Sequence, residues 1–176
     1  LTKEIKLIVV DSEWVLIDWD KYPGNNKGCD IKTREDFYTE FKDLIIKNQD
    51  KRIIVALHHP VISSGVHAGF TSAKSHLSAL RGRVPVPGLA TLINILRSSS
   101  GVSMEDLSNQ HYTDFANRIK SIIQDKENVI LISGHDHNLQ YHEERNIKQI
   151  ISGAGSKTDP SAIAEKTDFS YGGSGF

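Results

Sequence analysis

The sequence predicts an α/β fold, because short apolar segments of strand length alternate along the chain with longer amphipathic segments of helical period. Residues 52–57 and 128–133 are nearly all apolar and rich in Ile and Val, which is typical of strands inside a sheet. Each of these two segments runs directly into histidines. Ligands of α/β sheets bind at the carboxyl ends of strands, so this fold class also predicts where a site would lie.

The first part of the chain is predicted to contribute two strands and a loop. Residues 4–10 and 13–18 are both apolar and rich in β-branched side chains, and the turn-like Asp11 and Ser12 between them favour antiparallel pairing. Residues 21–32 contain Pro, Gly and Asn, which is the composition of a loop.

A helix is predicted next, followed by the first of the two buried strands. Thr33 and Asp36 have the spacing of a capping box, with Asp in place of the usual Glu or Gln. Residues 52–57 are predicted to be central and covered on both faces. The helix ends near Asn48, and its apolar stripe consists of Phe37, Phe41, Leu44 and Ile45.

A second helix is predicted before the strand 128–133. Two further strands, 139–143 and 148–152, turn at 144–146, and Gly153 to Gly155 close the ordered part. Residues 70–109 are predicted to form an insertion that is either a cap over the site or a plain surface excursion. The stripe of the second helix consists of Tyr112, Phe115, Ile119, Ile122 and Ile123.

Composition narrows the class of protein. The 176 residues are enough for one domain, and the net charge of −1 gives no basic excess for nucleic acid. No apolar run has the length of a transmembrane helix, and the single Cys29 excludes an internal disulfide framework. The start at Leu1 and the Gly-rich end suggest cuts in a longer protein.

Histidines follow both apolar strands. In an extended backbone His135 and His137 would share one face, and Gly134 would let the chain turn close to an ion. His58 and His59 follow the other strand, so imidazoles would gather at one edge of the sheet. Neutral imidazole binds zinc, iron and other divalent metals, whereas surface or packing histidines are the alternative interpretation.

These segments resemble a known family. Leu57-His58-His59-Pro60 and residues 133–141 resemble the last two motifs of the calcineurin-like metallophosphoesterases, most closely those of the purple acid phosphatase branch. Residues 151–155, followed by 159–161, are also similar to that branch. The resemblance covers most of residues 5–161, is weakest over 70–109, and implies a four-layer αββα sandwich that holds two metals.

The resemblance also implies a role for each matching histidine. His58 and His135 match two ligands of one metal, and His137 matches a ligand of the other. His67, nine positions after His58, matches a catalytic histidine that contacts the phosphoryl group or helps to protonate the leaving group; an ordinary loop histidine is the alternative. His59 is expected only to support the site, and Asn138 to hold its loop. His76, His111 and His142 match nothing and are predicted to lie at the surface.

Three upstream motifs of the family are absent: Asp-x-His, Gly-Asp-x-x-Asp and Gly-Asn-His-Asp/Glu. Asp11-Ser12-Glu13 does not fit the first, and Gly24-Asn25-Asn26 does not fit the last. We therefore expect residues 1–161 to be the C-terminal portion of an incomplete catalytic domain, followed by a tail or linker over 162–176.

For the parent protein the resemblance implies hydrolysis of phosphoesters at a dinuclear centre of Fe, Mn or Zn. This chain alone is expected to show weak or single-metal occupancy and negligible turnover, because the carboxylate ligands are missing. Its expected partners are a phosphoester substrate, the N-terminal half of its domain and, through exposed strand edges, copies of itself. The resemblance favours an exported protein, periplasmic or extracellular. The alternatives are an inactive scaffold, or a structural zinc on His58, His135 and His137.

Overall fold

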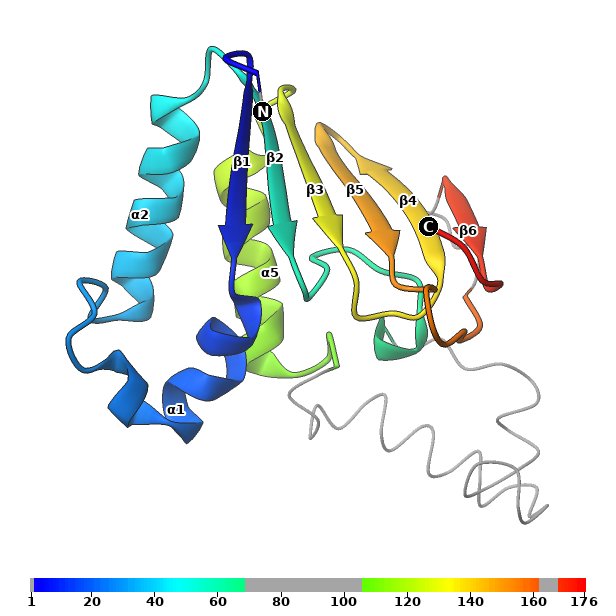
Figure 1. Ribbon diagram of the computed structural model, residues 1–176, viewed down its shortest axis with the longest axis horizontal. Helices are drawn as coiled ribbons and strands as arrows, with labels where there is room; N and C mark the ends of the chain where they lie inside the picture. Colours follow the sequence, from blue (N-terminus) through cyan, green and yellow to red (C-terminus); the bar gives the residue numbers. More distant parts are fainter. Residues whose placement is uncertain (1, 69–105, 162–167) are drawn as a thin grey trace.

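The computed structural model describes residues 2–68, 106–161 and 168–176. Within them six strands form one mixed sheet in the order β1-β2-β3-β5-β4-β6 (Figure 1). β1, β2, β3 and β5 run parallel, whereas β4 is antiparallel to both β5 and β6. The strands are β1 (Ile5–Val10), β2 (Arg52–Leu57), β3 (Val129–Ser133), β4 (Leu139–Glu144), β5 (Ile147–Ser152) and β6 (Phe169–Tyr171).

The α/β class and five of the six strands were predicted from the sequence, and these predictions are confirmed. The sixth strand, β6, lies within residues 162–176, which were predicted to be a tail or linker. It pairs with β4 at the edge of the sheet, so part of that range belongs to the fold. The predicted insertion 70–109 lies almost wholly outside the described residues.

The strand registers align the carboxyl ends of three neighbouring strands. Val10 of β1 lies beside Leu57 of β2, and Leu57 lies beside Ser133 of β3. Parallel strands in this register deliver the residues that follow them to one edge of the sheet. The segments that begin at Asp11, His58 and Gly134 therefore leave the sheet side by side.

The predicted second strand, 13–18, is wrong. These residues form a π-helical segment, η1 (Trp14–Asp18), that continues into α1 (Trp19–Lys21). The Asp11 carboxylate accepts a hydrogen bond from Trp14 N at 3.0 Å and so caps the helical segment. Short apolar runs fit both strand and helix periods, and here burial of Val15 and Leu16 accompanies the helical alternative. A short 3₁₀ turn, η2 (Pro23–Asn26), lies in the predicted loop.

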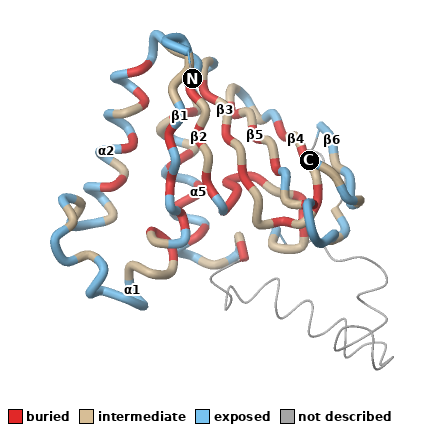
Figure 2. Tube along the Cα trace, in the orientation of Figure 1, coloured by how far each residue is buried: buried red, intermediate tan, exposed pale blue. Residues whose placement is uncertain are grey.

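Two long helices cover one face of the sheet. α2 (Arg34–Lys47) begins with the predicted capping box, in which Thr33 and Asp36 each bind the other's backbone N–H. α5 (Gln110–Ile123) contacts α2, and both pack on strand residues that share one buried cluster (Figures 1 and 2). No helix among the described residues is long and apolar enough to cross a bilayer.

The opposite face of the sheet is apolar but less buried. β2 is central in the sheet, as predicted. Ile53, Val55 and Leu57 are buried, whereas Ile54 and Ala56 on its other face are only half-buried, so the predicted cover is complete on one face alone. In β1, Val9 is 74% exposed although Val10 is 7% exposed. The described residues thus form one sheet with helices on one face, and the four-layer sandwich stays a prediction.

Candidate metal centre

Three histidines meet at the aligned carboxyl ends of β2 and β3. His58 and His59 directly follow β2, and His135 lies two residues after β3. One ligand-type nitrogen from each of the three lies within 4.8 Å of the others. The His58 Nε2 and His135 Nδ1 atoms are 3.2 Å apart. Imidazole nitrogens in this arrangement could hold a metal ion.

The loop after β3 is bent, not extended. His135 has φ 67°, in the left-handed region, and residues 135–138 form consecutive bends. The prediction that His135 and His137 share one face required an extended backbone, and that premise is wrong. His135 faces the histidines that follow β2, whereas the Nδ1 atom of His137 lies 2.6 Å from Asp159 Oδ2.

His59 lies inside the cluster and not merely behind it. Its side chain is 1% exposed, and its ring centroid is 4.6 Å from that of His135. Burial, followed by the nearby His135, His58 and His67, lowers the pKa of His59 to about 3. The ring is therefore neutral at pH 7, which is the form that binds metal. Sequence reasoning gave His59 only a supporting role.

A carboxylate orients His67. Its Nδ1 atom lies 2.9 Å from Asp106 Oδ1, and the Asp106 side chain is 5% exposed. The His67 ring centroid lies 4.2 Å from that of His135, so His67 belongs to the same group of rings. Its predicted catalytic role stays a prediction. Asp106 was missed because nothing in the sequence relates it to a histidine 39 positions away.

The loop that carries His58, His59 and His67 is held by buried polar side chains. Gln149 Oε1 accepts hydrogen bonds from Val61 N and Ile62 N at 3.1 and 3.0 Å. Gln140 Oε1 accepts one from Ser64 N at 2.8 Å. Both glutamines are 0–2% exposed. The sequence does contain a signal for them: both glutamines occupy inward-facing positions of predicted strands, which apolar side chains usually fill.

Asp136 joins the two loops of the site. It is fully buried, and its carboxylate accepts hydrogen bonds from Ser63 Oγ at 2.5 Å and His67 N at 3.3 Å. A Cβ atom at Gly65 would lie 2.4 Å from the Asp136 carboxylate, so only glycine fits there. Asp136 therefore fixes the loop after β2 relative to the loop after β3.

Asn138 and His137 extend the site towards residue 159. Asn138 is fully buried; its Oδ1 atom accepts from Gln140 Nε2 at 2.6 Å and its carbonyl from Gly153 N at 3.1 Å, in keeping with a loop-holding role. Burial alone would raise the pKa of Asp159, but the hydrogen bond from His137 and the charge of Lys157 bring that pKa below its usual value.

The remaining histidines differ from one another. His142 was predicted at the surface but is fully buried beside Gln140, with its Nε2 atom 2.6 Å from Gln140 Oε1, so that prediction is wrong. His111 is exposed, as predicted. His76 lies outside the described residues.

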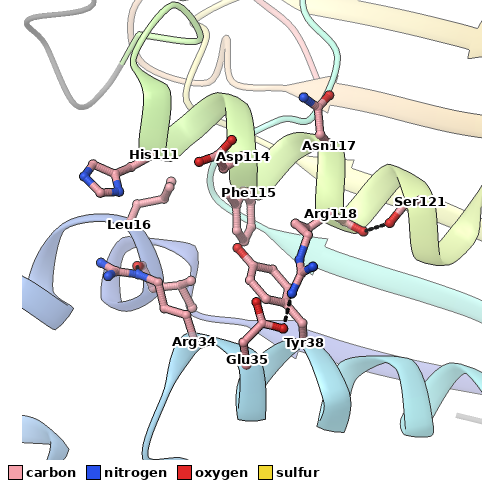
Figure 3. A pocket seen from close by; sticks show the side chains of 11 residues that line it. Leu16, Arg34, Glu35, Tyr38, His111, Asp114, Phe115, Asn117, Arg118 and Ser121 are labelled. Carbon is pink, nitrogen blue, oxygen red and sulfur yellow. Dashed lines mark hydrogen bonds and ion pairs between the residues drawn. The ribbon is translucent and has the colours of Figure 1, made fainter.

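A separate cavity of about 510 Å³ lies between α2, η1 and α5 (Figure 3). Both arginines that line it are paired with carboxylates: Arg118 with Glu35, and Arg34 with Asp20. Arg118 also lies over the Tyr38 ring, 4.8 Å from its centroid. None of the clustered histidines lines this cavity, so it is distinct from the candidate metal centre.

Comparisons with known proteins show the fold alone. No family model and no curated protein matches the chain. A solved structure described as GAP50, the anchor in the inner membrane complex of Plasmodium, is similar with a TM-score of 0.51 and 18% identity. The match covers 96% of this chain and 38% of that chain, so this chain spans well under half the length of GAP50. PhoD is a weaker neighbour, with a TM-score of 0.35, 13% identity, and coverage of 65% and 19%. The chain thus has an α/β fold similar to part of GAP50.

Proposed function

We propose that this chain forms part of a metal-dependent phosphoesterase whose metal binds at the histidine cluster. The observation that carries this proposal is the approach of His58, His59 and His135 to within 4.8 Å at the carboxyl ends of neighbouring parallel strands. The reaction class rests on the resemblance of the two surrounding motifs to calcineurin-like metallophosphoesterases.

The donor set fits a metal ion. All three side chains are imidazoles, and the lowered pKa of His59 leaves that ring neutral with a nitrogen lone pair available. When bound, such an ion supplies a Lewis acid that activates water and withdraws charge from phosphoryl oxygens. Fe, Mn and Zn all accept nitrogen ligands, and any of them is compatible with the proposal.

His67 and His137 have assigned places in this proposal. Asp106 holds the Nδ1 atom of His67 and leaves Nε2 free to donate a hydrogen bond to a phosphoryl oxygen or a proton to the leaving group. Asp159 holds the Nδ1 atom of His137 in the same manner, and carboxylates commonly orient metal-binding histidines in this way. In the parent protein His137 would serve a second ion, which makes the centre proposed there dinuclear.

The test is hydrolysis of a chromogenic phosphomonoester and a phosphodiester, with Zn²⁺, Mn²⁺ or Fe²⁺ supplied. It is run on this chain and on the longest form of the protein that contains it. We expect activity in the longer form that requires metal, disappears in His135→Ala and persists in His111→Ala, the matched change at an exposed histidine. Equal activity in both variants would contradict the assignment of the site.

A non-enzymatic scaffold is the second candidate. Two observations favour it. GAP50 is described as an anchor. Among the described residues, the group of three histidines within 4.8 Å of one another includes no carboxylate. Folded protein that binds metal but hydrolyses neither substrate would favour the scaffold over the enzyme.

The outer face of the sheet supports the proposed partners. One row across the sheet consists of apolar residues that are half-buried or exposed: Val9, Ala56, Ile132, Ile150, Tyr141 and Phe169. Sheets that are apolar on both faces are normally covered on both. We propose that the remainder of the catalytic domain covers this face in the parent protein and that copies of this chain associate through it when alone. We also propose an exported location, from the resemblance to purple acid phosphatases.

A further inference from the structure

Three strand ends, not two, converge on the histidine cluster. β1 is hydrogen-bonded to β2, and Val10 lies beside Leu57 at the same edge from which His58 and His59 emerge. Ser12 and Glu13 follow β1 by two and three residues. The chain turns into a helical segment there, so both residues stay at the edge of the sheet.

Ser12 fixes the orientation of His59. The Ser12 side chain is fully buried, and its Oγ atom lies 2.9 Å from His59 Nδ1 and accepts a hydrogen bond from His59 N at 3.1 Å. With Nδ1 engaged, the Nε2 atom of His59 is the one available to a ligand. A carboxylate oxygen, Glu13 Oε2, lies 3.7 Å from this Nε2 atom.

One of two separate distances at this edge matches the spacing of ligands on a shared tetrahedral ion, and the other is somewhat longer. Two ligand atoms bound to one zinc ion at about 2.0–2.1 Å with tetrahedral angles lie roughly 3.3 Å apart. His58 Nε2 and His135 Nδ1 are 3.2 Å apart, and Glu13 Oε2 is 3.7 Å from His59 Nε2. The Glu13 side chain is 48% exposed, and it lies outside the group of three histidines whose nitrogens are within 4.8 Å of one another. Its carboxylate must therefore move closer to His58 and His135 to share their ion.

We propose that, in the 176-residue chain by itself, Glu13 is the fourth ligand of a mononuclear, tetrahedral site formed with His58, His59 and His135. This site has no open position for water, so it is distinct from the dinuclear centre proposed for the parent protein. The chain would then supply one carboxylate of its own, from a position that matches no metal motif in the sequence. Three imidazoles and one carboxylate suit Zn²⁺ or Co²⁺ better than Mg²⁺ or Ca²⁺, which prefer all-oxygen ligands. This site does not require phosphoester hydrolysis.

The experiment titrates the metal-free 176-residue chain with Co²⁺ and then displaces the Co²⁺ with Zn²⁺. Tetrahedral Co²⁺ has a much stronger visible absorption than octahedral Co²⁺, so the spectrum reports geometry as well as affinity. We expect one tetrahedral ion per chain. Glu13→Gln should lower the Co²⁺ affinity at least about tenfold, because the loss of a residue that only supports a metal ligand already costs about that much. Glu40→Gln, the same change at an exposed position of α2, should bind like the wild type.

Two further variants test the ligand set. Glu13→Asp keeps the charge but shortens its reach, so its affinity should lie between those of Glu13→Gln and the wild type. His137→Gln should leave Co²⁺ binding unchanged, because His137 contacts Asp159 and is not among the three clustered histidines. Unchanged binding in Glu13→Gln, or loss of binding in His137→Gln, would overturn the assignment.

Melting curves provide an independent readout. A ligand that binds only the folded state raises its stability, so Zn²⁺ should raise the Tm of the wild type and raise that of Glu13→Gln by less. Far-UV circular dichroism checks that each variant is folded. An octahedral spectrum in the folded wild type would also refute the proposal. No phosphoester is present in these measurements, so the outcome is separate from that of the hydrolysis test.

Discussion

The covered face of the sheet has an apolar half and a polar half. One row across the strands runs from Ile8 through Val55 and Leu131 to Gln149 and His142. Its side chains are apolar in β1, β2 and β3 and polar in β5 and β4. α2 and α5 pack over the apolar half. The loop after β2 is bound to the polar half through Gln149 and Gln140.

The difference explains how the site is positioned. Apolar packing is non-directional, so it fixes the helices without specifying individual atoms. Hydrogen bonds require particular donors and acceptors at particular distances. The loop with His58, His59 and His67 is fixed by such bonds, and its histidines are therefore held in place by the polar half of the sheet.

Acid should affect this polar region most strongly. The pKa of His59 is about 3 in the folded chain and near 6.5 when unfolded, so the unfolded state binds the extra proton first. The contribution of neutral His59 to the free energy of unfolding is therefore complete above pH 6.5 and is lost as the pH falls towards 3. The loss is up to roughly 5 kcal/mol, at about 1.4 kcal/mol per pKa unit. Denaturant unfolding of the metal-free chain at a series of pH values measures this loss. His59→Gln should flatten the profile, and superimposable profiles would contradict the argument.

Truncation in the apolar half should separate stability from metal binding. Leu131 is fully buried beneath the helices, and Leu131→Ala should lower the free energy of unfolding by about 2–5 kcal/mol. The loop with the histidines does not hydrogen-bond to Leu131, so Co²⁺ affinity of the folded fraction should stay close to that of the wild type. Denaturant unfolding and Co²⁺ titration of one preparation test both parts, and a large loss of affinity would count against separate roles.

Replacement of a residue in the polar half should affect Co²⁺ affinity more than stability. Gln149→Met keeps the volume but leaves the buried N–H groups of Val61 and Ile62 without an acceptor, at a cost of about 1–3 kcal/mol. The loop then loses its anchor, and Co²⁺ affinity should fall even in the folded fraction. Gln149→Glu keeps the acceptor oxygen and should retain more affinity than Gln149→Met. If the two variants bind Co²⁺ equally, the hydrogen bonds to Gln149 Oε1 do not position the site.

The two halves also differ in how well the sequence predicts them. Periodicity and capping identified both long helices and five strands, because apolar side chains repeat at helical or strand spacing. The histidine cluster followed from strand ends, since parallel strands share one edge. The partners of the histidines did not: Ser12, Asp106 and Asp136 lie on other segments, and only the folded register brings them together. The left-handed His135 likewise has no sequence signal.

The outer face provides the smallest expected effect on stability. Val9 lies in β1 at the edge of the sheet, and its side chain is 74% exposed on the face away from the helices. Val9→Lys removes little packing, so the free energy of unfolding should change by no more than about 0.5 kcal/mol. A charged side chain on an edge strand should instead oppose association between sheets.

The measurement is sedimentation of the wild type and Val9→Lys over a range of protein concentrations. We expect the wild type to associate as concentration rises and the variant to stay monomeric longer, because the lysine charge would be buried in any contact through this face. Val10→Lys is the matched contrast on the same strand: Val10 is 7% exposed beneath the helices, and its replacement should destabilise the fold itself. Equal association of the wild type and Val9→Lys would show that another surface is responsible.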